Sequence, residues 1–235
     1  MKHLNLILII LILSCCPLHP VYAFLDKDIR LLTMRDGLAD NTIPCIYKDE
    51  DGFMWFGTDN GLSRYDGKTI QNFKPANTYV SIAAIVRLSD DFLGIVSDGY
   101  LYYFNRKQET FFPIHTESDT AIGVFNVLPA DDSSFWGISG NRLILCQWEI
   151  RQGKEEEKTA VRVRIQKTFQ LLEEKGEVFS SLCYHEKAGS GIWLTTNRGN
   201  LILFHPDTPE AYQKIPLTDG KPLQGTSILN RDGVV

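Results

Sequence analysis

A short unit repeats along this chain, and its clearest copy occupies residues 42–73. Four apolar runs alternate there with polar turns that contain Asp-Gly or Asn-Gly, and the runs cover residues 43–47, 53–58, 62–65 and 69–73. These dipeptides favour the positive φ angles of tight hairpin turns, so the copy predicts four short antiparallel strands. A sheet of this kind cannot bury its apolar surface alone and has to stack on neighbouring copies.

Three further copies follow at intervals that indicate one fold class. Leu93 is expected to take the place of Trp55, and Trp136 and Trp193 mark the third and fourth copies. The first two intervals, 38 and 43 residues, fit the period of a β-propeller blade, roughly 40 to 50 residues. We therefore predict an all-β protein, a β-propeller of four-stranded antiparallel blades, with blades at approximately 41–75, 78–116, 120–172 and 177–217.

Residues 226–235 match the opening of the first copy, with the Asp-Gly at 232–233 in the place of Asp51-Gly52. We expect a partial fifth blade at 225–235 and an incomplete ring. The chain is then expected to be a fragment of a longer product or the product of a truncated gene. Its open sheet edges would make it prone to associate.

The interval between Trp136 and Trp193 is longer, at 57 residues. Residues 151–158 are polar and charged, and residues 160–165 alternate between apolar and charged side chains. This pattern predicts an extended hairpin tip followed by the outermost strand of the third blade. A helix remains an alternative for residues 166–175.

The recurring Trp and Gly residues have a structural explanation. A Trp that occurs once per blade fills the wedge between neighbouring sheets, and the Gly residues occupy turn positions. We expect these repeat residues to be structural: Trp55, Gly57, Gly61, Trp136, Trp193 and Gly199.

Residues 1–23 differ from the rest of the chain. Lys2 is followed by an apolar run at residues 4–13, and the segment closes on Val-Tyr-Ala at 21–23. This layout predicts a secretory signal peptide that is removed before Phe24, leaving a propeller domain at 24–235. The apolar run is about half of the roughly 20 residues that span a bilayer. An uncleaved anchor and lipidation at Cys15 remain alternatives.

The net charge limits the classes of binding partner, and the cysteine pattern indicates the role of the thiols. The formal net charge is -5, which disfavours nucleic acid and anionic membrane surfaces. Cys45, Cys146 and Cys183 each lie in an apolar run without a C-x-x-C pair. We expect them to pack as small hydrophobic side chains.

The first copy also carries a family likeness. Residues 37–43, Gly-Leu-Ala-Asp-Asn-Thr-Ile, and residues 51–67, which include Asp-Gly-Phe-Met-Trp-Phe-Gly-Thr, resemble the two-component regulator propeller repeat. The likeness is looser in later copies, where Leu93 replaces the Trp and Gly94 is shifted. A short strand at 29–33 before the first repeat fits the start of such a protein.

The resemblance implies the N-terminal periplasmic propeller region of a hybrid two-component sensor of Bacteroidetes, in truncated form. Full-length relatives continue with further propeller blades, a membrane helix, a histidine kinase, a receiver and a DNA-binding domain. The resemblance implies detection of carbohydrate breakdown products and control of polysaccharide-utilisation genes. It also implies an oligosaccharide ligand and a homodimer of the full-length protein.

The sequence contains no complete motif of the enzyme or metal-binding classes that we considered. The His185-Glu186 pair lacks a second His at metalloprotease spacing, and Asp49 and Asp51 lack the remaining ligands of a calcium loop. We expect no catalytic residue, metal or cofactor in this fragment. A periplasmic propeller enzyme that acts on glycans and a secreted interaction scaffold remain the alternatives.

A ligand is expected at one end of the blades. The turn between the second and third strands of each blade lies at the same end as the link to the next blade. Short polar side chains suited to sugar hydroxyls occur in these turns, and the links add Asn77 and Asp119. The alternative is that these residues only form turns. The candidate ligand-binding residues are Asp59, Asn60, Asp98, Asn141, Asn197 and Arg198.

Overall fold

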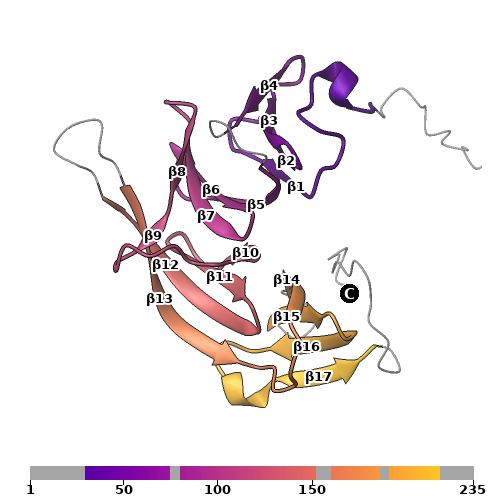
Figure 1. Cartoon of the computed structure of the whole chain (residues 1–235), viewed down its shortest axis with the longest axis vertical. Coiled ribbons are helices and arrows are strands. Elements are labelled where there is room, and N and C mark those ends of the chain that lie inside the picture. Colours follow the sequence, from indigo (N-terminus) through magenta and orange to yellow (C-terminus); the bar gives the residue numbers. More distant parts are fainter. Residues whose placement is uncertain (1–29, 75–79, 152–159, 186–190, 218–235) are drawn as a thin grey trace, which may run out of the picture. The chain divides into compact units, whose positions relative to one another are not determined.

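The computed structural model describes residues 30–74, 80–151, 160–185 and 191–217 (Figure 1). The chain divides into two compact units, Met1–Leu32 and Thr33–Val235, and all of the described strands belong to the second. The predicted signal peptide, the cleavage before Phe24, Cys15 and the partial fifth blade lie outside the described residues. No described helix is long and apolar enough to cross a membrane.

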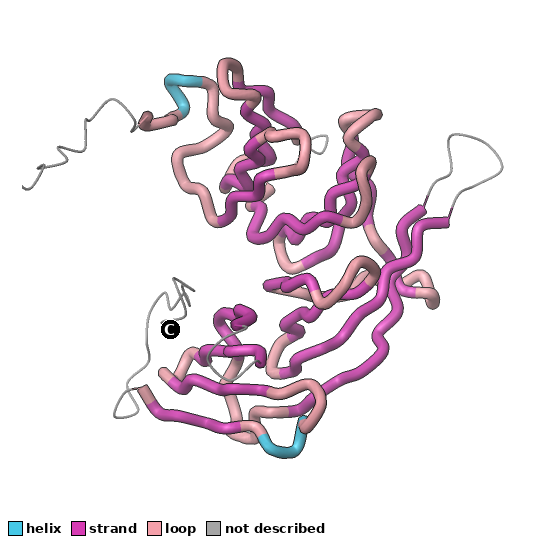
Figure 2. Tube along the Cα trace, turned by 180° about the vertical axis from the view of Figure 1, so that it is seen from behind, coloured by secondary structure: helices cyan, strands magenta, loops and turns pink. Residues whose placement is uncertain are grey.

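The second unit contains four antiparallel sheets, each built from consecutive strands, which confirms the predicted all-β class and four-stranded blades (Figures 1 and 2). The first sheet contains β1 (Cys45–Lys48), β2 (Met54–Thr58), β3 (Gly61–Tyr65) and β4 (Ile70–Phe73). The second contains β5 (Ile82–Arg87), β6 (Phe92–Ser97), β7 (Tyr100–Asn105) and β8 (Thr110–Pro113). The third contains β10 (Asn126–Pro129), β11 (Ser134–Ser139), β12 (Arg142–Arg151) and β13 (Ala160–Gln170). The fourth contains β14 (Phe179–His185), β15 (Gly191–Thr196), β16 (Asn200–Phe204) and β17 (Gln213–Pro216), with a 3-10 turn, η4 (Pro209–Ala211), before β17.

The third sheet differs from the expected pattern by one extra strand. β9 (His115–Thr116), from the link after the second sheet, pairs in parallel with Arg162 and Val163 of β13. This pairing covers part of the outer edge of β13, where backbone groups would otherwise lack partners. β13 continues to Gln170, so the helical alternative for residues 166–175 is excluded.

The segment before the first sheet is not a strand. Residues 30–33 have no regular structure, which corrects the expected strand at 29–33 over its described part. A 3-10 turn, η2 (Met34–Asp36), follows instead, because Thr33 and Asp36 form a capping box. The carboxylate of Asp36 accepts a hydrogen bond from the backbone N–H of Thr33 at 2.9 Å.

Aromatic trios fill two of the wedges between neighbouring sheets. Trp55 of β2 packs against Phe73 of β4 and Phe104 of β7, with ring centroids 6.0 and 5.7 Å away. Between the third and fourth sheets, Trp136 packs against Phe169 and Phe204 at 5.9 Å in both cases. Each trio therefore takes two rings from one sheet and the third ring from the sheet that follows.

Within the described ranges, no such trio lies between the second and third sheets. The expectation that Leu93 takes the place of Trp55 in the second repeat is wrong by one residue. Trp55 precedes Thr58, the last residue of β2, by three positions, and Gly94 has the same relation to Ser97 of β6. Leu93 points instead into the cluster between the first and second sheets.

Two aliphatic side chains fill the space beside Gly94. A Cβ at that position would lie 2.8 Å from Cγ2 of Val86 and 3.0 Å from Cδ2 of Leu88. Neighbouring residues of the same sheet therefore occupy most of the place of the Trp. An apolar hollow of about 10 Å³ remains between Gly94 and Phe135 of the third sheet.

Trp193 differs from the other two repeat Trp residues. Trp55 and Trp136 are buried, whereas Trp193 is half-buried. Its Nε1 atom is inaccessible to solvent and has no hydrogen-bond partner in the described part of the chain. The corresponding nitrogen of Trp55 donates a hydrogen bond of 2.7 Å to Asp49.

Candidate functional site

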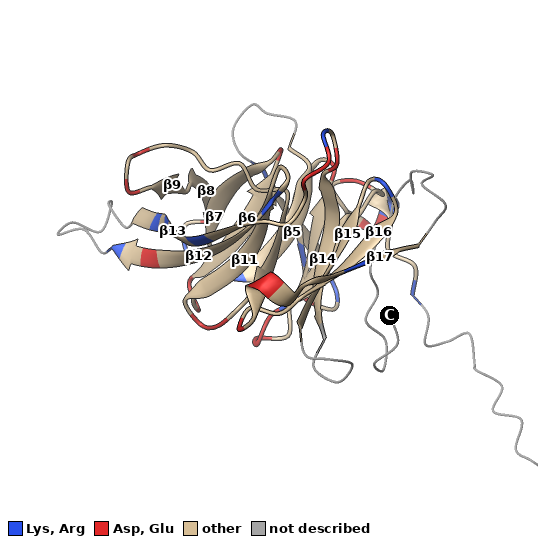
Figure 3. Cartoon of the chain, turned by 90° about the horizontal axis from the view of Figure 1, so that it is seen from below, with Lys and Arg blue, Asp and Glu red and all other residues tan. Residues whose placement is uncertain are grey.

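The six residues predicted to bind a ligand lie in corresponding loops. Each loop joins the second and third strands of its sheet: β2 to β3, β6 to β7, β11 to β12, or β15 to β16. We refer to this end of the four sheets as the loop end. Charged residues lie largely in loops and at strand ends (Figure 3).

In the first sheet, the two candidate residues bind neighbouring segments. Asp59 accepts a hydrogen bond of 2.8 Å from the hydroxyl of Ser81, just before β5. The amide of Asn60 donates to the carbonyl of Ala39 at 3.1 Å, and its oxygen accepts a hydrogen bond from Lys74. Both side chains therefore fix the entry and exit of the first sheet.

The fourth sheet uses its two candidate residues in the same way. The amide of Asn197 donates to the carbonyl of Gly176 at 3.2 Å and accepts from the N–H of Val178 at 3.0 Å. Arg198 donates to the carboxylate of Glu174 at 2.6 Å and to the carbonyl of Lys175 at 2.7 Å. Asn197 and Arg198 thus anchor the link from the third sheet.

Asp98 and Asn141 are the two candidates whose polar groups remain available. Both are exposed. Asp98 has a positive φ of 49°, and its carboxylate receives only a long hydrogen bond of 3.4 Å from Ser97 among the described residues. A ligand at the loop end would therefore meet these two side chains without displacing a structural contact.

The two link residues do not join this group. Asn77 lies outside the described residues, and the expectation for Asp119 is wrong. Its carboxylate accepts hydrogen bonds from Arg162 at 2.6 Å and interacts with His115 at 3.1 Å. Arg162 pairs with Glu149, far along β12 from the loop end, because β9 holds this link against β13.

A buried carboxylate reinforces the link before the fourth sheet. The side chain of Glu177 is fully buried and accepts hydrogen bonds from Thr196 at 2.8 Å, Asn200 at 2.6 Å and Lys214 at 2.9 Å. Burial, the largest influence, raises the pKa of Glu177, but the hydrogen bonds from these three residues together outweigh it and lower the pKa below its usual range.

Replacing Glu177 with Gln is expected to lower the free energy of unfolding at neutral pH by about 2 kcal/mol, because the hydrogen bonds lose their charged acceptor. The folded pKa lies below the unfolded one, so this stabilisation is present above the ordinary pKa of a glutamate and is lost as pH falls through the lowered value. Urea unfolding of both proteins at a series of pH values measures the effect. A constant difference between them down to acid pH would contradict this assignment.

A charged cleft lies between the first and second sheets at the opposite end. It has a volume of about 470 Å³, and Arg106 reaches across it from the loop after β7. Arg106 lies 3.0 Å from the carboxylate of Asp49 and 2.6 Å from that of Asp51. Asp49 also accepts hydrogen bonds from Trp55 and from the N–H of Phe53.

The other charges of this cleft pair in the same way. Arg87 binds Glu50 and Asp90, and Lys107 binds Asp91. The charged residues of this cleft therefore already have partners. The ion pairs of Arg106 with Asp49 and Asp51 connect the first and second sheets, and we call them the clamp. Asp51 of the Asp-Gly turn thus has a structural partner in Arg106. The role of Arg106 could not be predicted from the sequence, because Arg106 belongs to a different repeat from the residues it binds.

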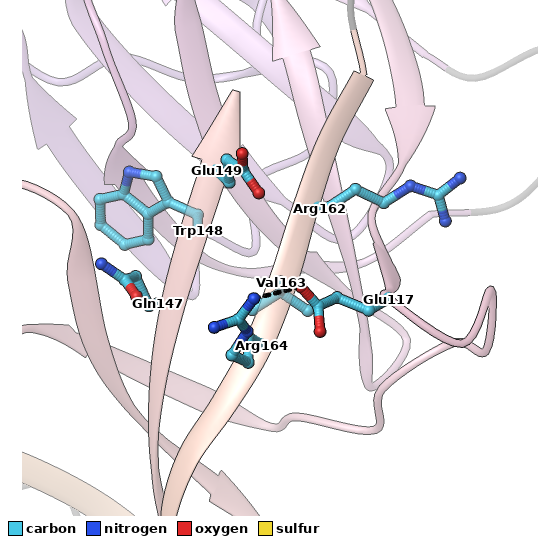
Figure 4. A pocket seen from close by; sticks show the side chains of 7 residues that line it. All are labelled: Glu117, Gln147, Trp148, Glu149, Arg162, Val163 and Arg164. Carbon is cyan, nitrogen blue, oxygen red and sulfur yellow. Dashed lines mark hydrogen bonds and ion pairs between the residues drawn. The ribbon is translucent and has the colours of Figure 1, made fainter. Parts of the chain in front are cut away.

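A second hollow, of about 270 Å³, lies against β12 and β13 (Figure 4). The carboxylate of Glu117 accepts a hydrogen bond of 2.5 Å from Arg164. Figure 4 shows this contact together with the side chains of Arg162 and Glu149. The nearby indole of Trp148 is buried against Phe135. The ion pair of Glu117 with Arg164 in this hollow attaches the link containing β9 to the third sheet.

Cysteine and metal chemistry add no site among the described residues. All three cysteines there are free thiols. Burial raises the pKa of Cys45 and Cys146 to about 12, so both remain protonated and unreactive at neutral pH. No group of three or more His, Cys, Asp or Glu side chains in the described ranges is placed to hold a metal ion.

Two solved structures are similar to this chain at low sequence identity. The WD40 β-propeller domain of Doa1 is 10% identical with a TM-score of 0.51, over 74% of this chain and 53% of that one. The extracellular domain of BT4673 of B. thetaiotaomicron, a proposed hybrid two component system, is 17% identical with a TM-score of 0.48. That match covers 76% of this chain and 28% of the BT4673 chain, so the chain spans little more than a quarter of that relative.

Sequence comparison identifies the repeat itself. Residues 37–60 match the two component regulator propeller family. No curated protein sequence matches the chain significantly. The matched segment runs through β1 and β2 into the β2–β3 loop, and contains Asp49 and Trp55. The first two strands of the first sheet of this β-propeller protein thus match a two-component regulator propeller repeat.

Proposed function

We propose that the chain is the ligand-sensing propeller module of an extracytoplasmic hybrid two-component sensor, and that its ligand is an oligosaccharide. The observation that carries the proposal is the regulator propeller repeat at residues 37–60 in an all-β, four-stranded blade. The signal-like sequence at 1–23 supports export. In this proposal the chain binds and does not catalyse, and the remaining blades and the membrane-bound kinase of a longer protein transmit the signal.

The loop end supports a neutral, hydroxyl-rich ligand. Asp98 and Asn141 offer carboxylate and amide groups that accept and donate hydrogen bonds, and both are exposed on adjacent sheets. The charges of the cleft around Arg106 are already paired, so the opposite end has less to offer a ligand. The proposed output is control of polysaccharide-utilisation genes by the full-length sensor, which does not require this chain to contact DNA.

Isothermal titration calorimetry with malto-, cello-, xylo-, manno- and arabinohexaose tests the proposal on the full chain. We expect at least one of these sugars to bind, and Asp98→Ala combined with Asn141→Ala to weaken its affinity about tenfold or more. Asp132→Ala, an exposed residue in the loop between β10 and β11 at the opposite end, is the matched control and should leave the affinity unchanged.

Absence of binding to every sugar by the wild-type chain would contradict the oligosaccharide ligand. Binding that survives the double replacement would instead move the site away from the loop end. Release of shorter sugars during the titration would contradict a purely sensory role.

A further inference from the structure

An exposed aromatic ring lies at the loop end next to Asp98. Phe125, in the link just before β10, leaves 61% of its surface exposed, and Tyr100 at the start of β7 leaves 50%. Single exposed hydrophobic residues are common and indicate nothing alone. Here the surrounding backbone makes the ring part of an ordered arrangement.

The ring of Phe125 lies against a glycine that leaves room for it. A Cβ at Gly99 would come within 3.3 Å of Cε1 of Phe125 and 3.7 Å of Cδ1. Gly99 also has a positive φ of 79°, which side-chain-bearing residues rarely adopt. The Asp-Gly turn thus serves two purposes, because it closes the hairpin and leaves room for the edge of the ring.

Backbone hydrogen bonds hold the link in place on both sides of the ring. The N–H of Val124 donates to the carbonyl of Gly99 at 2.8 Å, and the N–H of Phe125 donates to the carbonyl of Ile138 at 2.9 Å. The side chain of Val124 is fully buried, and Gly123 bridges to Tyr100. The backbone that carries the ring is therefore held in place before any ligand arrives, which reduces the entropy lost on binding.

Asp98 directly precedes the glycine under the ring. Its carboxylate is exposed and receives only the long hydrogen bond from Ser97. An aromatic ring packed on Gly99 and an available carboxylate on the preceding residue match the two surfaces of a pyranose. The C–H groups of the sugar ring are apolar and pack on aromatic faces, whereas its hydroxyls donate to carboxylate oxygens.

We infer that Phe125 and Asp98 form a subsite for one pyranose unit, whose C–H face stacks on the ring of Phe125 while neighbouring hydroxyls donate to Asp98. This inference rests on the proposed function, since it specifies how the oligosaccharide is held. The link between the second and third sheets supplies the apolar half of the subsite, and the β6–β7 loop supplies the polar half.

The test uses the full chain and whichever of the five hexasaccharides binds the wild type. Phe125→Leu keeps an apolar side chain but removes the aromatic face, and should weaken binding about tenfold. Phe125→Tyr restores the face and should bind within about twofold of the wild type. Asp98→Asn keeps a residue that tolerates a positive φ, and should also weaken binding about tenfold. Tyr184→Leu, which removes an exposed aromatic ring from the fourth sheet, is the control and should change nothing.

Saturation-transfer NMR supplies a second readout, because the C–H protons of the bound sugar should receive magnetisation from aromatic protons in the wild type and lose it in Phe125→Leu. A wild-type chain that binds while Phe125→Leu binds equally well would overturn the subsite and leave the proposed function standing. A wild-type chain that binds none of the sugars would overturn both. If Phe125→Leu changes self-association in gel filtration and not sugar affinity, the ring is a protein contact and the subsite is wrong.

Discussion

Replacing Arg106 with Met is expected to lower the free energy of unfolding by about 3 kcal/mol, as for other buried ion pairs that lose one partner. The side chain of Asp49 is only 4% exposed, and the guanidinium of Arg106 lies 3.0 Å from it. Without Arg106 the buried carboxylate keeps two hydrogen-bond donors, Trp55 and the N–H of Phe53, but no positive charge. Urea unfolding of the full chain measures the loss.

The neighbouring Lys107 provides the matched control. Its side chain is 74% exposed and pairs with Asp91 on the surface, so Lys107→Met should change stability by less than about 0.5 kcal/mol. Adding Asp49→Asn to Arg106→Met should recover part of the loss, because the uncompensated charge is removed. Equal effects of the two Met substitutions would show that the clamp contributes no more than a surface ion pair.

Replacing Gly57 with Ala is expected to cost about 3 kcal/mol through overpacking. The added Cβ would lie 2.7 Å from Cγ2 of Ile82 and 2.9 Å from its carbonyl oxygen, and it would also collide with Sγ of Cys45. The side-chain atoms can move, but the carbonyl belongs to β5 of the next sheet. The two sheets would have to separate slightly, which affects the whole wedge.

Gly140→Ala is the matched control, because it tests the cost of an unfavourable backbone conformation without the cost of overpacking. Gly140 has a positive φ of 61° but no atom within 4 Å of its added Cβ, so Ala there should cost about 1 kcal/mol. Adding Cys45→Ala to Gly57→Ala should recover only part of the loss, since the carbonyl of Ile82 remains. A cost at Gly57 no larger than that at Gly140 would contradict the packing explanation. Thermal and urea unfolding give the values.

The strands of the first sheet were predictable because local signals agree there. Asp-Gly and Asn-Gly turns separate apolar runs, and the observed strands begin or end within about two residues of those runs. The second sheet shows the limit of this approach. Leu93 precedes Gly99 by the same six residues that separate Trp55 from Gly61, so the sequence predicts Leu93 at the Trp position. In the structure, however, Gly61 begins a strand, whereas Gly99 lies inside the loop before its strand.

Long-range contacts account for most of what the sequence could not predict. β9 pairs in parallel with β13, so that His115 lies opposite Arg162, and no local sequence pattern predicts this pairing. The structural hydrogen bonds of Asn60 and Asn197 could not be predicted either, because the same residue types form turns and bind ligands. Phe125 reads in the sequence as another apolar residue before a strand. Only the backbone around Gly99 shows that its ring stays in solvent.

The aromatic trios have a consequence for how such a protein can grow during evolution. Each trio joins a Trp and a Phe of one repeat to a Phe of the following repeat. The four repeats do not carry this joint equally. The first has Trp55 but no Phe on its third strand, and the second has Phe104 on its third strand but Gly94 in place of a Trp. The fourth has both, Trp193 on β15 and Phe204 on β16. A duplicate of the fourth repeat would therefore copy both halves of the joint, whereas a duplicate of the first or second would copy one half and need a compensating change in a neighbour.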